Sequence, residues 1–590
     1  MSTGVRQQAS EVSSDRWSAY RSALPTVLAL GVVVAGLGYR VGLVLHGAPP
    51  TNSDEATMGL AALHIGQGRH FPVFFYGQAY MGTLEAWLAA PLLALTGPSV
   101  LALRLPTLAA YLLLLVLLWR LTWRLTGDRW FGVLVLALLA LGSDRAVKNQ
   151  LIAGGGYPEL GPAVAALALL TFGLVAGDTG RRLPRWAAWG FVAGLMIWVD
   201  PLLLPYLVAF GVVLAARCWR ELRGAAGAVL VAAVLAGAAP LLVDSVRAGR
   251  NPLAAVLTAG GAGQAAGWVD RLHGGLVLGP PLGMGFCSPG HCAPWQLWWT
   301  AAFPVLLVVA AVSAGRTLRR AGDPAVRAAA ALWLALLAGA VGTLAAYTVS
   351  SAAGLTPVES SRYLSCLLVS LPALLWPVWT AARRPGTRKA RRPTGRDTWR
   401  PTAGRDVWRP AAVRDVWRPA AVRGVAVVVL GATVGSAAVA TVGAVATVPA
   451  ARAEARRHDR LVATLRDLGV RHVLAPYWTC NRLTFATGEQ VVCAVVADDL
   501  SPGMDRYRPY RRLVAAAARP AFVAPVGSPV AAALDRHLAD PAESAASHPA
   551  GRPGEPEGHP AEEPGQGPVG PAGRLRLVEV DGYRIYLKIA

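Results

Sequence analysis

Long apolar runs recur through most of this chain and restrict its fold more than any other feature. We expect eleven of them to span a membrane, near residues 24–46, 99–121, 130–143, 159–177, 186–199, 202–217, 224–243, 297–314, 326–349, 363–382 and 424–447. A helix needs about 20 such residues to cross a bilayer, so the shorter third, fifth and sixth runs suggest tilted or partly re-entrant segments. Only 15% of the 590 residues are charged, against roughly 25% in soluble domains. The sequence therefore predicts an α-helical polytopic membrane protein.

The charges between these runs predict the orientation of the chain. Basic clusters fall in alternate loops, which the positive-inside rule assigns to the cytoplasm. The first run lacks a small-residue cleavage site, so we expect it to remain as an uncleaved span. This assignment puts residues 1–23 in the cytoplasm, and it puts the loops 47–98 and 245–296 and the C-terminal domain on the outer face of a cell membrane.

The block 383–423 concentrates positive charge, with thirteen basic and three acidic residues. It contains three copies of Arg-Asp-x-Trp-Arg-Pro, beginning at Arg396, Arg405 and Arg414. We interpret it as a duplicated, disordered cytoplasmic linker; the alternative is that its tryptophans enter the headgroup layer while its arginines bind lipid phosphates. No nucleic-acid-binding motif accompanies it, so the net charge of +22 does not indicate DNA or RNA as a partner.

Residues 450–590, after the last predicted span, have the composition of a small extracytoplasmic α/β domain. The predicted elements are a helix over 454–468, strands over 471–475 and 490–496, and a terminal hairpin around Asp581-Gly582. A Pro/Gly/Glu/Ala stretch, 541–573, is typical of a disordered insert.

Four of the six cysteines lie in segments predicted to be outside the cytoplasm, where thiols can oxidise. The candidate disulfides are Cys287–Cys292 and Cys480–Cys493. A zinc site that includes His291 in place of the first disulfide lacks a fourth ligand. We expect Cys218 and Cys366 to be free.

Two adjacent carboxylates, Asp54 and Glu55, follow the first span directly, where a charge near the membrane needs a partner or a function. One interpretation is structural, because Asn52 can cap a helix that begins near Ser53, with Glu55 completing a capping box. The other is catalytic. Loss of a cap costs about 1 kcal/mol, whereas loss of a general base costs about 10²–10⁴ in rate.

Other polar and aromatic side chains are candidates for the same site. Lys148 and Arg362 are candidate ligands of a phosphate, and the alternative for Arg362 is an ion pair with Glu359. His64 lies on an apolar helical stretch and is expected to pack rather than act as a base. The candidates for lining a substrate cavity are Tyr76, Gln78, Tyr80, Glu85, Tyr157, Glu159 and Tyr363.

Together these residues resemble GT-C-fold glycosyltransferases, the family of dolichyl-phosphate-mannose–protein mannosyltransferases and bacterial aminoarabinose and galacturonic-acid transferases. The resemblance covers most of residues 20–380 in layout, and it implies that residues 24–382 form a transmembrane catalytic region. The segments that carry it are Asp54-Glu55, 97–106, Arg362-Tyr363 and the C-terminal run 477–489.

The resemblance implies a hexosyl- or pentosyltransferase that takes its sugar from a polyprenyl phosphate, with membrane lipids around it and an envelope glycan, lipid or protein as acceptor. Asp54 would be the base in an inverting transfer, and Glu55 would position it or contact the acceptor. Arg362 and then Lys148 would bind the donor phosphate. We predict no cofactor and no metal. The alternatives are a polyprenyl-linked sugar or lipid transporter and a non-catalytic envelope assembly factor; ionisable residues at span ends, rather than centres, favour the transferase.

Overall fold

The computed structural model describes residues 2–177, 180–249, 251, 265–287, 290–383, 419–539 and 575–589, with side chains from residue 23 onward. The three Arg-Asp-x-Trp-Arg-Pro repeats, apart from Pro419, lie outside the described residues. The stretch 541–573 also lies outside them.

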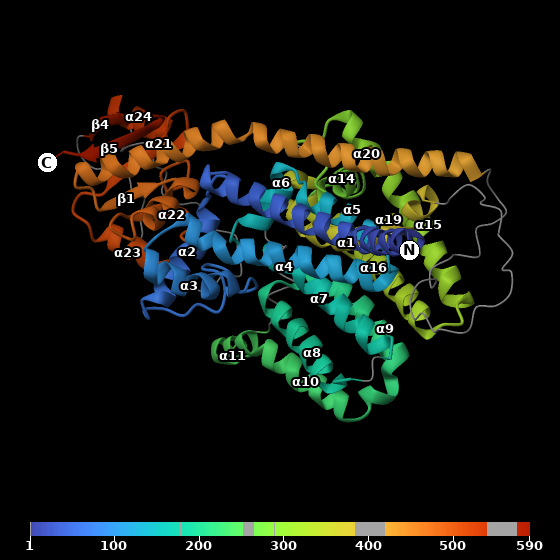
Figure 1. Cartoon of the computed structure of the whole chain (residues 1–590). Coiled ribbons are helices and arrows are strands. Elements are labelled where there is room, and N and C mark those ends of the chain that lie inside the picture. The colour runs from blue at the N-terminus through green and yellow to red at the C-terminus, as the bar shows by residue number, and fades with distance from the viewer. Residues whose placement is uncertain are drawn as a thin grey trace.

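Helices form the larger part of the molecule (Figure 1). Their bounds are α1 Ser2–Leu45, α2 Ser53–Gly66, α3 Leu84–Thr96, α4 Val100–Thr126, α5 Arg129–Ala140, α6 Asp144–Leu151, α7 Tyr157–Val175, α8 Arg182–Val199, α9 Leu204–Leu222, α10 Ala225–Gly237, α11 Ala239–Ala248, α13 Trp268–Leu272, α14 Gly279–Gly283, α15 Trp298–Arg320, α16 Pro324–Val349, α17 Ser351–Leu355, α18 Pro357–Ser360, α19 Leu371–Ala382 and α20 Pro419–Ala446. Between α18 and α19 the chain forms a ten-residue 3₁₀ helix, η4, over Ser361–Ser370. Runs of this kind are seldom longer than four residues.

Eight helical segments of the described chain are long and apolar enough to cross a membrane, and the number is up to ten if two bent helix pairs each count as one span. The sequence predicts eleven. The difference is the run 186–199, which belongs to α8 and is not among these spans. The first turn of α8 carries Arg182 and Arg185, whose charges reduce its apolar length.

The third predicted run, 130–143, does not form one straight transmembrane helix. It is divided between α5 and α6, whose axes differ by 90°. Ser143 caps the second helix, because its hydroxyl accepts a hydrogen bond from the Ala146 N–H at 3.2 Å. Lys148 lies on α6, the second helix of this bent pair. The run 224–243 is similarly divided between α10 and α11, at 61°.

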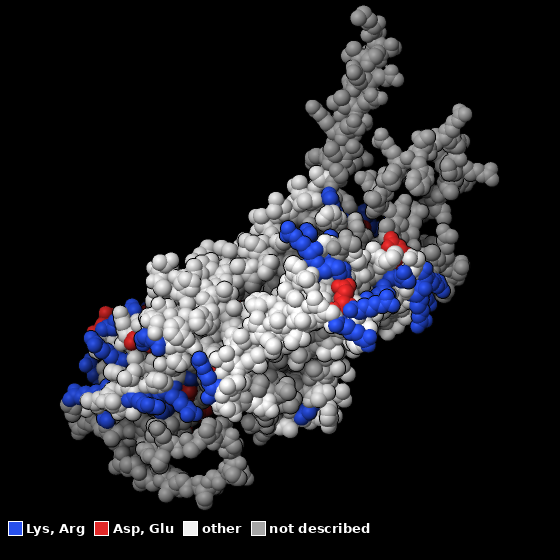
Figure 2. All heavy atoms as spheres, turned by 90° about the horizontal axis from the view of Figure 1, so that it is seen from below, with Lys and Arg blue, Asp and Glu red and all other residues white. Residues whose placement is uncertain are grey.

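The distribution of charge on the surface agrees with a membrane-embedded body. On the face shown in Figure 2, lysine and arginine gather toward the two ends of the molecule, and the band between the ends is mostly uncharged. Large apolar side chains are exposed along several spans, among them Val34, Val212 and Val308. Exposed apolar surface on this scale is typical of contact with lipid.

The C-terminal domain is a five-stranded mixed sheet with strand order β2-β1-β3-β5-β4. Its elements are α21 Val448–Asp467, β1 His472–Ala475, α22 Tyr477–Ala486, β2 Val492–Val495, α23 Pro509–Ala515, β3 Ala521–Pro525, α24 Pro529–Ala539, β4 Leu575–Val580 and β5 Tyr583–Lys588. The predicted first helix, first two strands and terminal hairpin are confirmed. The sequence prediction missed β3, which joins the parallel pair to the hairpin.

Helix α22 attaches this domain to α2, and Figure 1 shows α2 and α3 beside the domain, at the end of the molecule away from the N-terminus. One face of α22, with residues four apart in sequence, lies along α2. The contacts pair Ser53 with Tyr477, Thr57 with Asn481, and Gly59 with Phe485. Asn481 donates to the Thr57 hydroxyl at 3.0 Å, and a Cβ atom on Gly59 would lie 2.5 Å from the Phe485 ring. Part of the run 477–489 therefore joins the C-terminal domain to α2.

We expect Gly59→Ala to destabilise the protein. The added methyl group would overlap the buried ring of Phe485, and overpacking of this kind costs about 1–3 kcal/mol. Thermal unfolding of the detergent-purified protein measures the effect. Gly31→Ala is the matched control, because nothing lies within 4 Å of that position, and it should leave the midpoint unchanged or raise it. Equal midpoints for the two variants would contradict the close packing of α2 against α22.

Candidate functional site

The start of α2 confirms half of the predicted capping box. Asn52 is the N-cap, and its side-chain oxygen accepts a hydrogen bond from the Glu55 N–H at 2.8 Å. The Glu55 carboxylate does not return this bond, because it turns instead toward the transmembrane helices. The cap therefore fixes the first turn of α2, and both acidic side chains of that turn bind other partners.

Glu55 forms a buried ion pair with Arg104 of α4. The guanidinium donates from Nε and Nη2 to the two carboxylate oxygens, each at 2.7 Å, and also donates to the carbonyl of Pro49 at 2.9 Å. Glu55 is 0% exposed and Arg104 is 1% exposed. Both oxygens of Glu55 are therefore bound by Arg104.

Asp54 projects away from this pair and remains 21% exposed. Its Oδ1 atom accepts a hydrogen bond from the hydroxyl of Tyr477 and lies 3.4 Å from Nη2 of Arg506. Both partners belong to the C-terminal domain, so α2 and the C-terminal domain meet at this carboxylate. Sequence reasoning included Tyr477 only in the family resemblance, and it did not single out Arg506.

Arg362, the second residue of η4, interacts electrostatically with the same carboxylate. Its guanidinium lies over the rings of Tyr157 and Tyr363, at 5.2 and 5.5 Å from their centroids. Its Nε is buried and has no hydrogen-bond partner in the described part of the chain. The alternative pairing with Glu359 is wrong, because Glu359 pairs with Arg145 at 3.4 Å.

Two further predicted residues lie in this group. Lys148 is largely buried and interacts electrostatically with Arg362, Glu55 and Asp54. Tyr80 interacts electrostatically with both Arg362 and Arg506. The region around Asp54 therefore contains several cations close to one partly exposed carboxylate, which suits an anionic ligand.

Three further candidates, Glu85, Glu159 and Gln78, form no hydrogen bond with Asp54. Glu85 is buried and accepts hydrogen bonds from the N–H groups of Gly155 and Gly156, at 3.1 and 3.2 Å. These glycines have φ values of 127° and 83°, which side chains rarely adopt, and the turn wraps the carboxylate. Glu159 interacts electrostatically with Glu85, and one of its oxygens is buried without a partner among the described residues. The same is true of the amide oxygen of Gln78.

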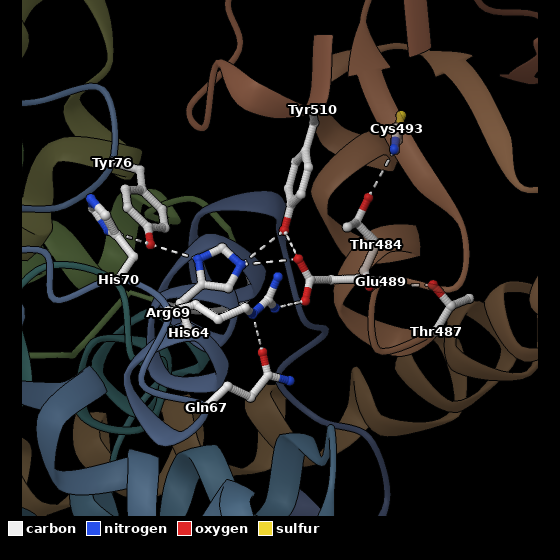
Figure 3. A network of polar contacts seen from close by, with 10 residues as sticks. All are labelled: His64, Gln67, Arg69, His70, Tyr76, Thr484, Thr487, Glu489, Cys493 and Tyr510. Carbon is white, nitrogen blue, oxygen red and sulfur yellow. Dashed lines mark hydrogen bonds and ion pairs between the residues drawn. The ribbon is translucent and has the colours of Figure 1, made fainter. Parts of the chain in front are cut away.

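Tyr76 belongs to a second network of hydrogen bonds and ion pairs, which connects the end of α2 to the C-terminal domain (Figure 3). Its hydroxyl lies 2.7 Å from Nδ1 of His64, whose Nε2 lies 3.0 Å from a carboxylate oxygen of Glu489. Tyr510 donates to that oxygen at 2.8 Å, and Arg69 pairs with the other. Burial raises the pKa of Glu489, but the hydrogen bonds from His64, Arg69 and Tyr510 lower it to about 2. His64 is a satisfied packing residue, as expected.

The cysteines form two disulfides, Cys287–Cys292 and Cys480–Cys493, so the first pair is not a zinc ligand set. The second disulfide joins α22 to β2. Cys218 and Cys366 are free and buried. Among the described residues, no group of three or more histidine, cysteine, aspartate or glutamate side chains could hold a metal ion.

We expect Arg104→Met to be strongly destabilising, because it leaves Glu55 buried without its cation. The loss of one partner of a buried pair costs about 3–5 kcal/mol, which thermal unfolding in detergent would detect. The double variant Glu55→Met/Arg104→Met is the control, and it should recover part of the lost stability. A single variant as stable as the parent would contradict this assignment of Glu55.

Known proteins resemble this chain in structure rather than in sequence. No protein-family model and no curated protein matches the sequence. ArnT from Cupriavidus metallidurans in the apo state matches the structure with a TM-score of 0.51 at 14% identity, over 97% of this chain and 98% of ArnT. ArnT bound to undecaprenyl phosphate also matches, with a TM-score of 0.51 at 13% identity, over 96% and 98%. Over nearly its whole length, this chain has the fold of ArnT. This is the GT-C fold that the sequence resemblance to glycosyltransferases implies.

Proposed function

We propose that this protein is a membrane glycosyltransferase that moves a sugar from a polyprenyl phosphate to an acceptor hydroxyl. The observation that carries the proposal is the electrostatic interaction of Asp54, a partly exposed carboxylate, with the cations Arg362 and Lys148. A base and a phosphate-binding cation are the two groups that such a transfer requires. The fold shared with ArnT supports the proposal, since one ArnT structure is bound to undecaprenyl phosphate.

In the proposed reaction, Asp54 accepts the proton of the acceptor hydroxyl. The oxygen attacks the anomeric carbon of the sugar while the bond from that carbon to the phosphate oxygen breaks on the opposite side. The configuration of the anomeric carbon is therefore inverted. Asp54 acts through Oδ2, because Oδ1 is already bound by Tyr477.

The departing polyprenyl phosphate gains one negative charge as its phosphodiester becomes a monoester. Arg362 suits the stabilisation of this charge, since the rings of Tyr157 and Tyr363 hold its guanidinium and its Nε has no other partner among the described residues. Lys148 adds a second positive charge. We propose that these two cations together stabilise the departing phosphate.

We propose that transfer takes place on the outer membrane face, with an envelope glycan, lipid or protein as acceptor. The domain next to Asp54 contains the Cys480–Cys493 disulfide, and disulfides persist in oxidising compartments. The N-terminus lies at the other end of the molecule (Figure 1), which agrees with the cytoplasmic position predicted from loop charge.

We expect Asp54→Asn to lower transfer by about 10²–10⁴-fold, because the amide cannot accept the proton. The assay supplies membranes with a panel of undecaprenyl-phosphate-linked radiolabelled hexoses and pentoses and measures label in the acceptor fraction. Asp459→Asn, on the exposed face of α21, is the matched control. Full transfer by Asp54→Asn would exclude this residue as the base. No transfer by the parent with any donor would favour the transporter or the assembly factor.

We expect Arg362→Met to weaken the binding of undecaprenyl phosphate, the product, more than the binding of the donor. The product carries the extra negative charge that Arg362 stabilises, so its inhibition constant should rise by a larger factor than the KM of the donor. The kcat should also fall, by about tenfold or more. Equal changes in both constants would mean that Arg362 binds the carrier without stabilising its departure.

A further inference from the structure

The two oxygens of Asp54 have different surroundings. Oδ1 accepts a hydrogen bond from the Tyr477 hydroxyl and lies 3.4 Å from Nη2 of Arg506. No donor in the described part of the chain is bonded to Oδ2. A carboxylate held by one oxygen has its other oxygen fixed in direction and available for a proton.

The two residues that bind Oδ1 act as a connected pair. Arg506 Nε donates to the Tyr477 hydroxyl at 2.7 Å, and this hydroxyl in turn donates to Asp54. Burial, followed by the negative charge of Asp54, raises the pKa of the Tyr477 hydroxyl. Tyr477 therefore keeps its proton and remains a donor.

The surrounding structure restrains both side chains. The Ser53 hydroxyl donates to the carbonyl of Tyr477, at the first residue of α22, and the Cys480–Cys493 disulfide ties that helix to β2. The Arg506 guanidinium lies 5.0 Å from the centre of the buried Phe75 ring, and Arg506 is only 11% exposed. A functional group has to be held within about 0.5 Å of its working geometry, and packing and hydrogen bonds of this kind provide such restraint.

We propose that Tyr477 and Arg506 are positioning residues, through which the C-terminal domain holds Oδ1 of Asp54 so that Oδ2 faces the acceptor hydroxyl. This inference rests on the proposed role of Asp54 as the base. It makes the C-terminal domain a part of the active site. The transmembrane part supplies the base and the phosphate-binding cations, and the domain fixes the direction of the base.

The same contacts would also exist if they only docked the domain onto α2, and the two roles predict different results. Docking already has other contacts, including the pairing of Thr57 with Asn481 and the network around Glu489. A docking residue changes stability when it is altered. A positioning residue changes kcat while stability and the KM of the donor stay the same.

The test compares Tyr477→Phe with Tyr507→Phe in the undecaprenyl-phosphate sugar assay, using the full-length protein. Each substitution removes one hydroxyl from the same domain, but Tyr507 contacts His64 and Tyr76 only through its ring and does not touch Asp54. We expect Tyr477→Phe to lower kcat by about 10–100-fold, the range for a lost hydrogen bond to a charged group. The donor KM should stay within about twofold, and the thermal midpoint should equal that of Tyr507→Phe, which keeps parental activity.

Arg506 gives a second, independent measurement. Arg506→Lys keeps a positive charge near Oδ1, so it should retain more kcat than Arg506→Met at equal thermal stability. This comparison distinguishes positioning from docking if Tyr477→Phe does not fold.

Parental kcat in Tyr477→Phe, beside an inactive Asp54→Asn, would overturn the positioning role and leave the proposed function intact. A fall in thermal midpoint with unchanged kcat would assign the pair to docking and also overturn it. Normal transfer by Asp54→Asn would instead overturn the proposed function.

Discussion

Consecutive residues of a helix project about 100° apart, and the site depends on this constraint. Asp54 and Glu55 are consecutive in the first turn of α2, so their side chains point in different directions. Glu55 turns inward to Arg104, where both of its oxygens are bound. Asp54 turns toward the C-terminal domain and the guanidinium of Arg362. The pairing of one carboxylate inside the protein thus determines the direction of the other.

The buried ion pair of Glu55 and Arg104, between α2 and α4, contributes more to the geometry of the site than to the stability of the fold. Removing two charges from water costs about as much as their attraction returns, so a buried ion pair adds little net stability. It does allow only one arrangement of the first turn of α2, because an offset of one residue would leave a charge buried without a partner. The Asn52 cap and the α22 contacts act on the same turn. Three independent restraints therefore act where the chain leaves its first span.

Much of the fold could be predicted from sequence, because apolar length and loop charge are local properties. The terminal hairpin and the Asn52 cap were also predicted from local sequence signals, and both are present. The partners of the charged residues could not be predicted. Glu55 and Arg104 are 49 positions apart, and Asp54 and Arg506 are 452 positions apart. No sequence motif around Arg506 indicates a functional role for it, whereas Tyr477 lies in a run that the family resemblance had already included.

The 3₁₀ geometry of η4 affects how Arg362 reaches the site. A 3₁₀ helix rises about 2.0 Å per residue and an α-helix about 1.5 Å, so ten residues differ in length by roughly 5 Å between the two forms. Arg362 is the second residue of this ten-residue stretch, and α19 continues directly from its other end. The stretched winding thus carries the guanidinium about one helical turn farther from α19 than ordinary coiling would. Its reach toward Asp54 is a property of backbone pitch as much as of side-chain length.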